Sequence, residues 1–365
     1  MAIFRYSAWA GLVIIWLVLL LGVQFPLRKK CPAPIILLIS IAKMLLATAL
    51  AYAVIATDTI FSHTLGFPIA ALYVAVFGDA VGDVVLLLSS VWKKERTVKL
   101  QASACTLCTL AYFLYGTINM QTVSANRMTI VSEKLSREYT VAFVSDMHVG
   151  SSQSMNTTEN TIRKISLESP DLIILGGDIV DEYTTKEEME RVFSLFGELD
   201  IPVYFIYGNH DRQPNADIAV GRTFTPQELE STILKNNIHI LKDEWVNISD
   251  DLVILGREDY SSSERLPIDS ISARPENAFV LQIDHSPYIY DEIEKSNSDL
   301  QISGHTHAAQ FFPLQFIYGI AGYDAYGFYR HGNTDVYVSS GASGWRVPFR
   351  TEGFCHYEII TLKAP

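Results

Sequence analysis

Hydrophobic residues gather in four long runs in the first third of the chain, and beyond them they fall into short segments between polar stretches. The long runs cover residues 8–25, 35–56, 68–92 and 102–121. Each approaches the roughly 20 residues that a helix needs to cross the hydrocarbon core of a bilayer. Because a cleaved signal peptide has a single, shorter apolar run, the pattern predicts an N-terminal α-helical transmembrane domain of about four helices over residues 1–125.

The charges between these runs predict their orientation. The loop between the second and third runs has no Lys or Arg, whereas the loops on either side are basic. The basic residues are Arg28, Lys29, Lys30, Lys93, Lys94, Arg96 and Lys99. Basic loops stay in the cytoplasm. We therefore expect an integral protein of a plasma or inner membrane, with everything after residue 122 on the extracytoplasmic side.

Three ionisable residues interrupt the apolar runs, namely Lys43, Asp79 and Asp83. Asp79 and Asp83 are four residues apart and share a helix face, and Lys43 can reach the same depth from the second run. Charges within a membrane are costly and usually face the interior of a helix bundle. The three residues indicate either a buried ion pair that fixes helix packing or a polar pocket for a lipid headgroup or a proton.

Residues 126–365 have the pattern of a separate domain with mixed strands and helices. Residues 127–145 look extended, and short apolar strands recur at 171–178, 201–210 and in six later segments up to the C-terminus. Residues 186–199 look helical, and Thr225 with Glu228 has the spacing of a capping box at a helix start. Because βαβ units precede direct strand-to-strand steps, we expect an α/β (α+β) domain of packed sheets flanked by helices. The polar stretch 257–277 predicts a lid or binding loop.

Charge separates the same two parts. Residues 1–125 hold nine Lys or Arg and four Asp or Glu, a net charge of +5, whereas the remaining residues hold 19 basic and 36 acidic side chains, a net charge of −17. A face that binds bulk nucleic acid is basic. The second part is therefore not expected to bind nucleic acid.

Five clusters of polar residues follow the expected strands of the second part. They are Asp146 with His148, Asp178 with Asp181, Asn209 with His210 and Asp211, His285 alone, and His305 with His307. Loops at strand ends can converge on one site, and burial of so many polar groups without a partner is costly. Together the clusters predict a metal centre.

The donor types limit the metal. Carboxylates and imidazoles without thiolates suit Mn²⁺, Fe or Zn²⁺ and not a cysteine-rich zinc site or an oxygen-only Ca²⁺ cage. So many candidate ligands exceed what one ion with an open position can take. We therefore expect two divalent ions that share one carboxylate, with manganese the first candidate.

The ordered motifs resemble the calcineurin-like metallophosphoesterase family over about residues 139–362. The motifs are Asp146-x-His148, Gly177-Asp178-x-x-Asp181, Gly208-Asn209-His210-Asp211, His285 and Gly304-His305-x-His307. The segments GHTHAAQFFPL and YVSSGASGW resemble its membrane-linked branch. The resemblance implies a four-layer fold with two β-sheets flanked by helices. One departure is Ala308-Ala309, where the family pattern leads us to expect two glycines.

The resemblance also implies roles for the residues. The first ion would be bound by Asp146, His148 and His307, and the second by Asn209, His285 and His305, with Asp178 bridging the two. His210 would take the role of the catalytic histidine, and Asp211 would orient it. Arg346, Arg350 and His331 are candidate contacts for the phosphate of the substrate.

The implied activity is hydrolysis of a phosphate ester or diphosphate. Two ions about 3.5–4 Å apart acidify a bridging water, and the resulting hydroxide attacks phosphorus. An intact site beside a membrane anchor favours a lipid-linked substrate, and a soluble extracytoplasmic substrate is the alternative within the enzyme class. A non-catalytic membrane receptor or scaffold that keeps the fold is a further alternative, but no ligand of the motif set is missing.

Overall fold

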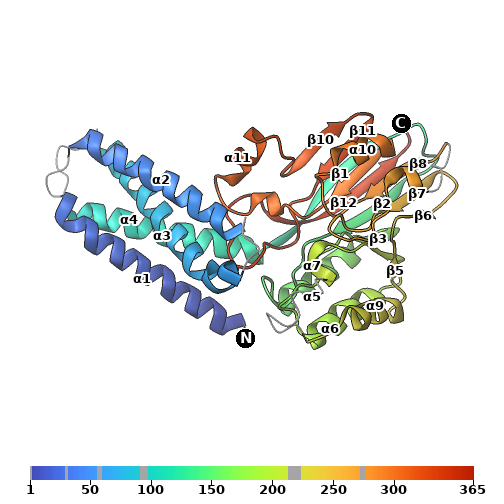
Figure 1. Ribbon diagram of the computed structural model, residues 1–365, viewed down its shortest axis with the longest axis horizontal. Helices are drawn as coiled ribbons and strands as arrows, with labels where there is room; N and C mark the ends of the chain where they lie inside the picture. Colours follow the sequence, from blue (N-terminus) through green and yellow to red (C-terminus); the bar gives the residue numbers. More distant parts are fainter. Residues whose placement is uncertain (1, 29–31, 56–59, 91–97, 213–222, 272–276) are drawn as a thin grey trace. The chain divides into compact units, whose positions relative to one another are not determined.

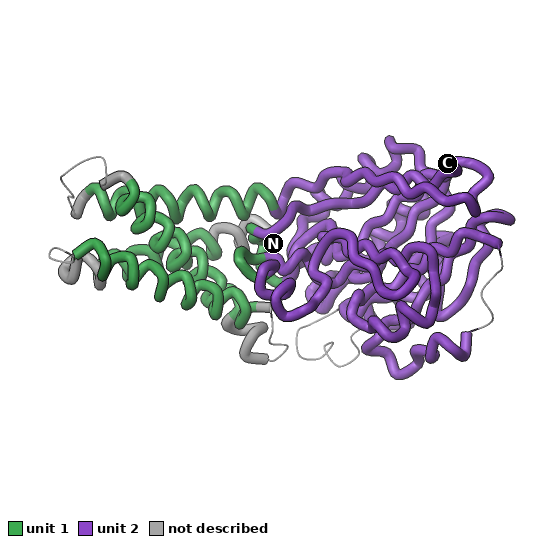
Figure 2. Tube along the Cα trace, turned by 90° about the horizontal axis from the view of Figure 1, so that it is seen from above, with its two compact units in different colours: residues 1–119, 311–314, 346–351 green, residues 120–310, 315–345, 352–365 purple. Residues whose placement is uncertain are grey.

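A computed structural model describes residues 2–28, 32–55, 60–90, 98–212, 223–271 and 277–365. The chain divides into two compact units (Figure 2). The helical unit comprises Met1–Asn119 together with Phe311–Leu314 and Arg346–Thr351, and the sandwich unit comprises Met120–Gln310, Gln315–Trp345 and Glu352–Pro365. Lys29, Lys30, Lys93, Lys94 and Arg96 of the basic loops, and residues 272–276 of the expected lid, lie outside the described residues.

Each of the four apolar runs forms a helix in the helical unit. The helices are α1 (Ala2–Arg28), α2 (Ala33–Ile55), α3 (Ile60–Ser90) and α4 (Val98–Gln121) (Figure 1). Among the described residues, two stretches are long and apolar enough to cross a bilayer, Ala33–Val54 and Gly66–Leu88, and the apolar stretch Ala8–Gly22 is shorter. By length and composition alone, two such helices are also compatible with a signal sequence or a buried core helix.

Small residues let α3 and α4 approach closely. A Cβ at Gly78 would overlap Thr109, and a Cβ at Gly82 would overlap Cys105. Close approach of backbones at small residues is the usual way in which helices pack in an apolar environment. Lys43 lies within the same unit, with its Nζ 2.6 Å from Asp79 Oδ2 and 2.7 Å from Asp83 Oδ2.

Two short loops from far along the chain complete the helical unit. Asn119 Nδ2 donates to the carbonyl of Arg350 at 3.2 Å, and the amide of Arg350 donates to the carbonyl of Gly116 at 3.0 Å. The rings of Tyr73 and Phe311 are 5.4 Å apart. The helical unit therefore includes segments that follow the metal-ligand motifs in sequence, which the hydrophobic pattern alone did not predict.

The described residues of the sandwich unit form two six-stranded sheets (Figure 1). The first has the order β1 (Val123–Val131), β12 (Cys355–Lys363), β2 (Tyr139–Val144), β3 (Leu172–Leu175), β4 (Val203–Phe205) and β5 (His239–Ile240). The second has the order β10 (Gly327–His331), β11 (Thr334–Val338), β9 (Leu300–Ser303), β8 (Phe279–Ile283), β7 (Leu252–Gly256) and β6 (Glu244–Asn247). The domain boundary expected between residues 125 and 126 falls inside β1, because this strand starts two residues after α4 ends.

Alternating side chains place the two sheets face to face with helices outside. Val141 and Phe143 of β2 join one core with Leu281 of β8, so this core lies between the sheets. Ala142 and Val144 point the other way, into a core formed with α5 (Met155–Leu167), α6 (Lys186–Gly197) and α9 (Pro226–Lys235). The helix α10 (Tyr290–Ser296) packs on β11. The prediction of two sheets flanked by helices is confirmed.

Local signals explain where these helices begin. Thr225 and Glu228 form the expected capping box at the start of α9, and Thr185 and Glu188 form another at the start of α6. In each case the Thr side chain accepts from the amide of the Glu, and the Glu carboxylate accepts from the amide of the Thr. These reciprocal bonds satisfy amides that the first turn of a helix leaves without partners.

Candidate metal centre

The carboxyl ends of the central strands deliver all seven predicted ligands. Asp146 and His148 follow β2, Asp178 follows β3, and Asn209 begins the short helix α7 (Asn209–Arg212) after β4. His285 follows β8, and His305 and His307 follow β9. Within each sheet these strands run parallel, so their carboxyl ends meet at one edge, which is where open α/β sheets bind ligands.

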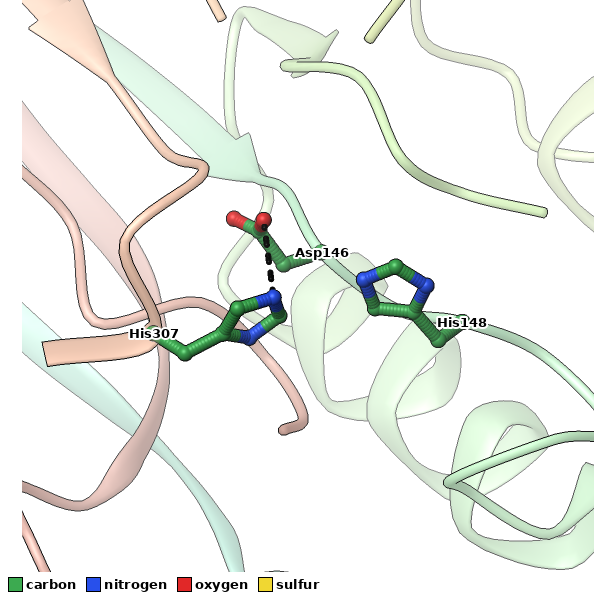
Figure 3. Close-up of side chains that lie close together, drawn as sticks. All are labelled: Asp146, His148 and His307. Atoms are coloured by element: carbon green, nitrogen blue, oxygen red, sulfur yellow. Dashed lines mark ion pairs between the residues drawn. The ribbon is translucent and has the colours of Figure 1, made fainter. Parts of the chain in front are cut away.

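Three predicted ligands form a first group. Ligand atoms of Asp146, His148 and His307 all lie within 4.8 Å of one another. The imidazoles approach the carboxylate from two sides, and His307 Nε2 is 3.6 Å from Asp146 Oδ1 (Figure 3). All three side chains are buried. One divalent ion fits this arrangement of two imidazoles and a carboxylate.

A second group lies beside the first. Ligand atoms of Asp178, His285 and His305 lie within 4.8 Å of one another, and Asn209 Oδ1 is 2.9 Å from His305 Nδ1. Asp178 Oδ2 is 3.0 Å from His285 Nε2 in this group and 3.9 Å from His148 Nε2 in the first. The carboxylate of Asp178 therefore reaches both groups, as a shared ligand must.

Outer hydrogen bonds fix the imidazoles so that Nε2 faces the carboxylates. The Nδ1 atoms are bonded to Asp181 Oδ2 at 3.1 Å for His148, to the Gly176 carbonyl at 2.9 Å for His285, and to the Ser343 carbonyl at 2.9 Å for His307. The buried Nε2 atoms of His148 and His285 have no partner with hydrogen-bond geometry in the described residues. Outer bonds of this kind are typical of imidazoles that ligate a metal, so the donor set fits a pair of divalent ions.

The backbone at the predicted ligands is strained. Asp146, His148, Asp178, His305 and His307 all have φ between +42° and +72°, a region that residues other than glycine rarely adopt. Strain of this kind persists where surrounding structure enforces it, and it gathers at functional sites. Neighbouring glycines leave room for these side chains, because a Cβ at Gly208 would overlap Asp178 and a Cβ at Gly304 would overlap Asp146.

The unusual alanines continue this strained turn. Ala308 and Ala309 are buried and have φ values of +47° and +62°. The left-handed region explains why glycines were expected there. The alanines retain the turn and displace no ligand from its group.

His210 is held by a carboxylate that the sequence analysis did not single out. Glu182 Oε2 is 2.9 Å from His210 Nδ1, and both side chains are buried. Asp211, expected to orient His210, accepts the backbone amides of Gly208, Asp178, Ile179 and Val180 at 2.7–3.2 Å. Asp211 thus holds the loop of Asp178, whereas Glu182 orients the His210 ring. Because Glu182 directly follows Asp181, sequence alone does not reveal which carboxylate faces which imidazole.

The charges in the site depend on each other. Burial disfavours a charged His210, but the carboxylates of Asp178 and Glu182 outweigh it and raise its pKa to about 9. Burial also opposes the ionised form of Asp178, yet His285, His210 and His148 hold its pKa well below the usual range. Burial together with His285 lowers the pKa of His305 to about 4. These directions favour an ionised Asp178 and a protonated His210, the form of a histidine that can act as an acid.

The candidate substrate contacts have different surroundings. Arg346 and Arg350 are buried and belong to the helical unit, where Arg346 Nη1 lies 3.5 Å from the Val54 carbonyl. His331 Nε2 is 2.6 Å from Asp324 Oδ2, and its ring stacks on Tyr290 at 4.3 Å. Contact of these three side chains with substrate stays a prediction.

The described part of the expected lid contacts the site through ion pairs and an aromatic ring. Arg265 Nη2 is 2.7 Å from Asp284 Oδ2 and 2.6 Å from Glu292 Oε2, and Asp284 precedes the predicted ligand His285. From the same stretch, the ring of Tyr260 lies 6.4 Å from that of His305. These contacts give residues 257–265 a fixed place beside the second ligand group.

Comparisons with known proteins agree with this geometry. Residues 139–309 match the family model of the calcineurin-like phosphoesterases. A Helicobacter pylori protein named an uncharacterized metallophosphoesterase is 30% identical over 60% of this chain and 59% of its own length. A Campylobacter jejuni protein of the same description is 26% identical over 76% of this chain and 74% of its own. A Bos taurus transmembrane protein with a metallophosphoesterase domain is 23% identical over 74% of this chain and 64% of its own. The chain thus spans about 59% of the length of the Helicobacter relative.

Proposed function

Because residues 139–309 form a calcineurin-like phosphoesterase domain, we propose that this protein is a membrane-anchored, metal-dependent hydrolase of phosphate esters or diphosphates. The observation that carries the proposal is the pair of ligand groups with Asp178 between them. The proposed metal ligands are Asp146, His148, Asp178, Asn209, His285, His305 and His307.

The donors favour one class of metal. Carboxylate, imidazole and amide donors without a thiolate suit Mn²⁺, with Fe and Zn²⁺ as competitors. When bound, such ions supply positive charge for the phosphate oxygens and acidify water. We propose manganese as the resident metal.

The residues of the chain supply the remaining chemistry. Glu182 holds Nδ1 of His210, so the Nε2–H of His210 can donate to the leaving oxygen or to the phosphate. Asp211 fixes the loop that carries Asp178 through four backbone amides. Burial of the ligand groups excludes bulk water and strengthens each of these interactions.

The helical unit supports the membrane part of the proposal. Ala33–Val54 and Gly66–Leu88 have the length and hydropathy of spans, and the bovine relative is a transmembrane protein by name. We propose that residues 1–125 anchor the protein in a plasma or inner membrane, that residues 126–365 face the extracytoplasmic side, and that the substrate is lipid-linked. The basic loops carry the orientation.

Hydrolysis of an artificial substrate tests the enzyme. The full-length protein in detergent with Mn²⁺ should cleave bis(p-nitrophenyl) phosphate or p-nitrophenyl phosphate. Asp178→Ala or Asn209→Ala should lower the rate by more than about 100-fold, because even the outer partners of metal ligands are worth 10–100-fold. Asp335→Asn is the matched control, since Asp335 is 51% exposed on β11. Activity that survives either ligand substitution would refute the two-metal site, and a wild type that binds metal without hydrolysing either ester would favour a receptor or scaffold.

Labelling of intact cells tests the orientation. A reagent that cannot cross membranes should modify a cysteine introduced at Leu167, whose side chain is 71% exposed. Labelling that needs permeabilised cells would place the sandwich unit in the cytoplasm instead.

A further inference from the structure

The helix α11 (Leu314–Ile320) exposes an apolar face. Leu314 is fully buried and fixes its start, whereas Ile317 is 38% exposed and Ile320 is 88% exposed. Phe316 in the same helix and Tyr323 just after it are 63% and 51% exposed. Large apolar side chains exposed together in this way mark a surface that meets a partner or a membrane.

The segment around this face carries no charge. Residues 311–323, FFPLQFIYGIAGY, contain no Asp, Glu, Lys, Arg or His, although the chain after residue 125 has a net charge of −17. A surface that meets an acidic or basic protein partner carries complementary charge. An uncharged segment of aromatic and aliphatic side chains matches the membrane–water interface, where amphipathic aromatic rings are enriched.

Covalent continuity ties α11 to the helical unit. Tyr73 Oη donates to the Phe312 carbonyl at 2.8 Å, and the rings of Phe77 and Phe312 are 5.7 Å apart. Both partners lie on α3 in the apolar stretch Gly66–Leu88. Tyr73 is seven residues, or about 10 Å, from the Gly66 end of that stretch. Interfacial helices bury their apolar faces to a similar depth, about 5–10 Å. Since α11 begins at Leu314, directly after these contacts, a lipid surface lies within its reach.

A row of aromatic rings joins α11 to the metal centre. The ring of His305 lies 5.6 Å from that of Tyr288, Tyr288 lies 5.7 Å from Tyr323, and Tyr323 lies 6.2 Å from Tyr318 on α11. These side chains offer apolar faces between a ligand of the second group and the exposed helix. An amphiphile with its phosphate at the metals could lay its apolar part along this row.

We propose that α11 and the loop to Tyr323 form a lipid-docking surface that inserts into the bilayer and presents membrane-resident phosphorylated amphiphiles to the site. The inference rests on the proposed hydrolase function and anchoring. Since insertion is driven by apolar burial without basic residues, it should not weaken at high salt, unlike binding through Lys and Arg clusters.

Depth-dependent quenching tests the docking directly. The full chain, with its native cysteines replaced by alanine, is labelled with an environment-sensitive fluorophore at Ile320→Cys and reconstituted in phosphatidylcholine vesicles. Lipids that carry a doxyl group near the headgroup should quench the label at least twofold. The matched control is Leu167→Cys, 71% exposed at the end of α5, where quenching should be absent. Equal quenching at both positions, or a blue-shifted label at 320 that doxyl lipids do not quench, would overturn the proposal, the second outcome pointing to a protein partner.

A kinetic split gives an independent measurement in the native cysteine background. Ile317→Gln/Ile320→Gln should lower kcat/KM at least tenfold for p-nitrophenyl hexadecyl phosphate in vesicles and leave soluble bis(p-nitrophenyl) phosphate within twofold. Leu167→Gln should change neither rate. An equal fall for both substrates, or no fall, would overturn the docking surface. If the wild type hydrolyses neither ester, the proposed function fails, and the quenching measurement still tests whether α11 inserts into the bilayer.

Discussion

Both units bury a cluster of charged side chains, but the two clusters are built differently. In the helical unit, Lys43 touches Asp79 and Asp83 at 2.6 and 2.7 Å, and Gln101 Nε2 donates to Asp83 Oδ1 at 3.0 Å. In the sandwich unit, His148 and His285 bring buried Nε2 atoms near carboxylates without hydrogen-bond geometry. The charged groups of the first cluster pair directly, whereas these two Nε2 atoms of the second lack a hydrogen-bond partner among the described residues.

The spacing of the ligand atoms explains this difference. His307 Nε2 and Asp146 Oδ1 are 3.6 Å apart, and His148 Nε2 and Asp178 Oδ2 are 3.9 Å apart, beyond a normal hydrogen bond. His285 Nε2 is nearer to Asp178 Oδ2, at 3.0 Å. Two atoms that each bind one ion at about 2.1 Å come to lie roughly 3–4 Å from each other. Direct pairing therefore favours a structural role for the helical cluster, and ion-sized spacing favours a metal role for the other.

The largest expected effect comes from breaking the ion pairs of Lys43 in the helical unit. Lys43→Met leaves two fully buried carboxylates, Asp79 and Asp83, without their cation. Removing one partner of a buried ion pair costs about 3–5 kcal/mol. Unfolding of the protein in detergent micelles should show this loss in the helical unit.

A neutral triple variant is the control for this prediction. Lys43→Met with Asp79→Asn and Asp83→Asn removes all three charges together, and replacing a whole buried pair is often close to neutral. The triple variant should therefore be more stable than Lys43→Met. If both variants lose equal stability, packing rather than charge holds the helices at this point.

The next effect concerns the outer partner of His210. Glu182→Gln should lower kcat about 10–100-fold without removing metal, because Glu182 touches none of the proposed ligands in the contacts of the described residues. The carboxylate also helps to raise the pKa of His210. A group that acts as an acid works below its pKa, so the alkaline limb of the pH profile should move to lower pH.

Rates and metal content of Glu182→Gln, measured together, check this prediction. Glu188→Gln is a suitable control, since Glu188 caps α6. A Glu182→Gln protein that loses metal along with activity would make Glu182 part of the ligand framework instead.

The sequence predicted the repeating features of both units better than their single contacts. Long apolar runs became helices because helix formation is cooperative along such stretches, and ligands at strand ends converged because parallel strands share an edge. Glu182 was not predicted as the partner of His210, because the two adjacent carboxylates Asp181 and Glu182 bond to different imidazoles. The strand β10 was not predicted because its sequence, GFYRH, has no apolar run. Joining of residues 311–314 and 346–351 to the helical unit depends on contacts more than 200 residues apart, which no local pattern contains.

The smallest expected effect concerns backbone strain, in which the helical unit and the metal centre also differ. No described residue other than glycine has a positive φ in α1 to α4, whereas Ala309 in the His307 turn has φ +62°. A left-handed alanine costs about 1–2 kcal/mol, and Ala309→Gly relieves this cost. The substitution also costs about 0.4–1 kcal/mol of stability because the unfolded chain becomes freer, and up to about 0.8 kcal/mol because a buried methyl group is lost.

Ala309→Gly should therefore be nearly neutral, whereas Ala325→Gly, at a buried position without positive φ, should cost about 1–2 kcal/mol. Chemical unfolding of the two metal-loaded variants compares them, and equal losses would show that the alanine turn beside the ligands stores no strain.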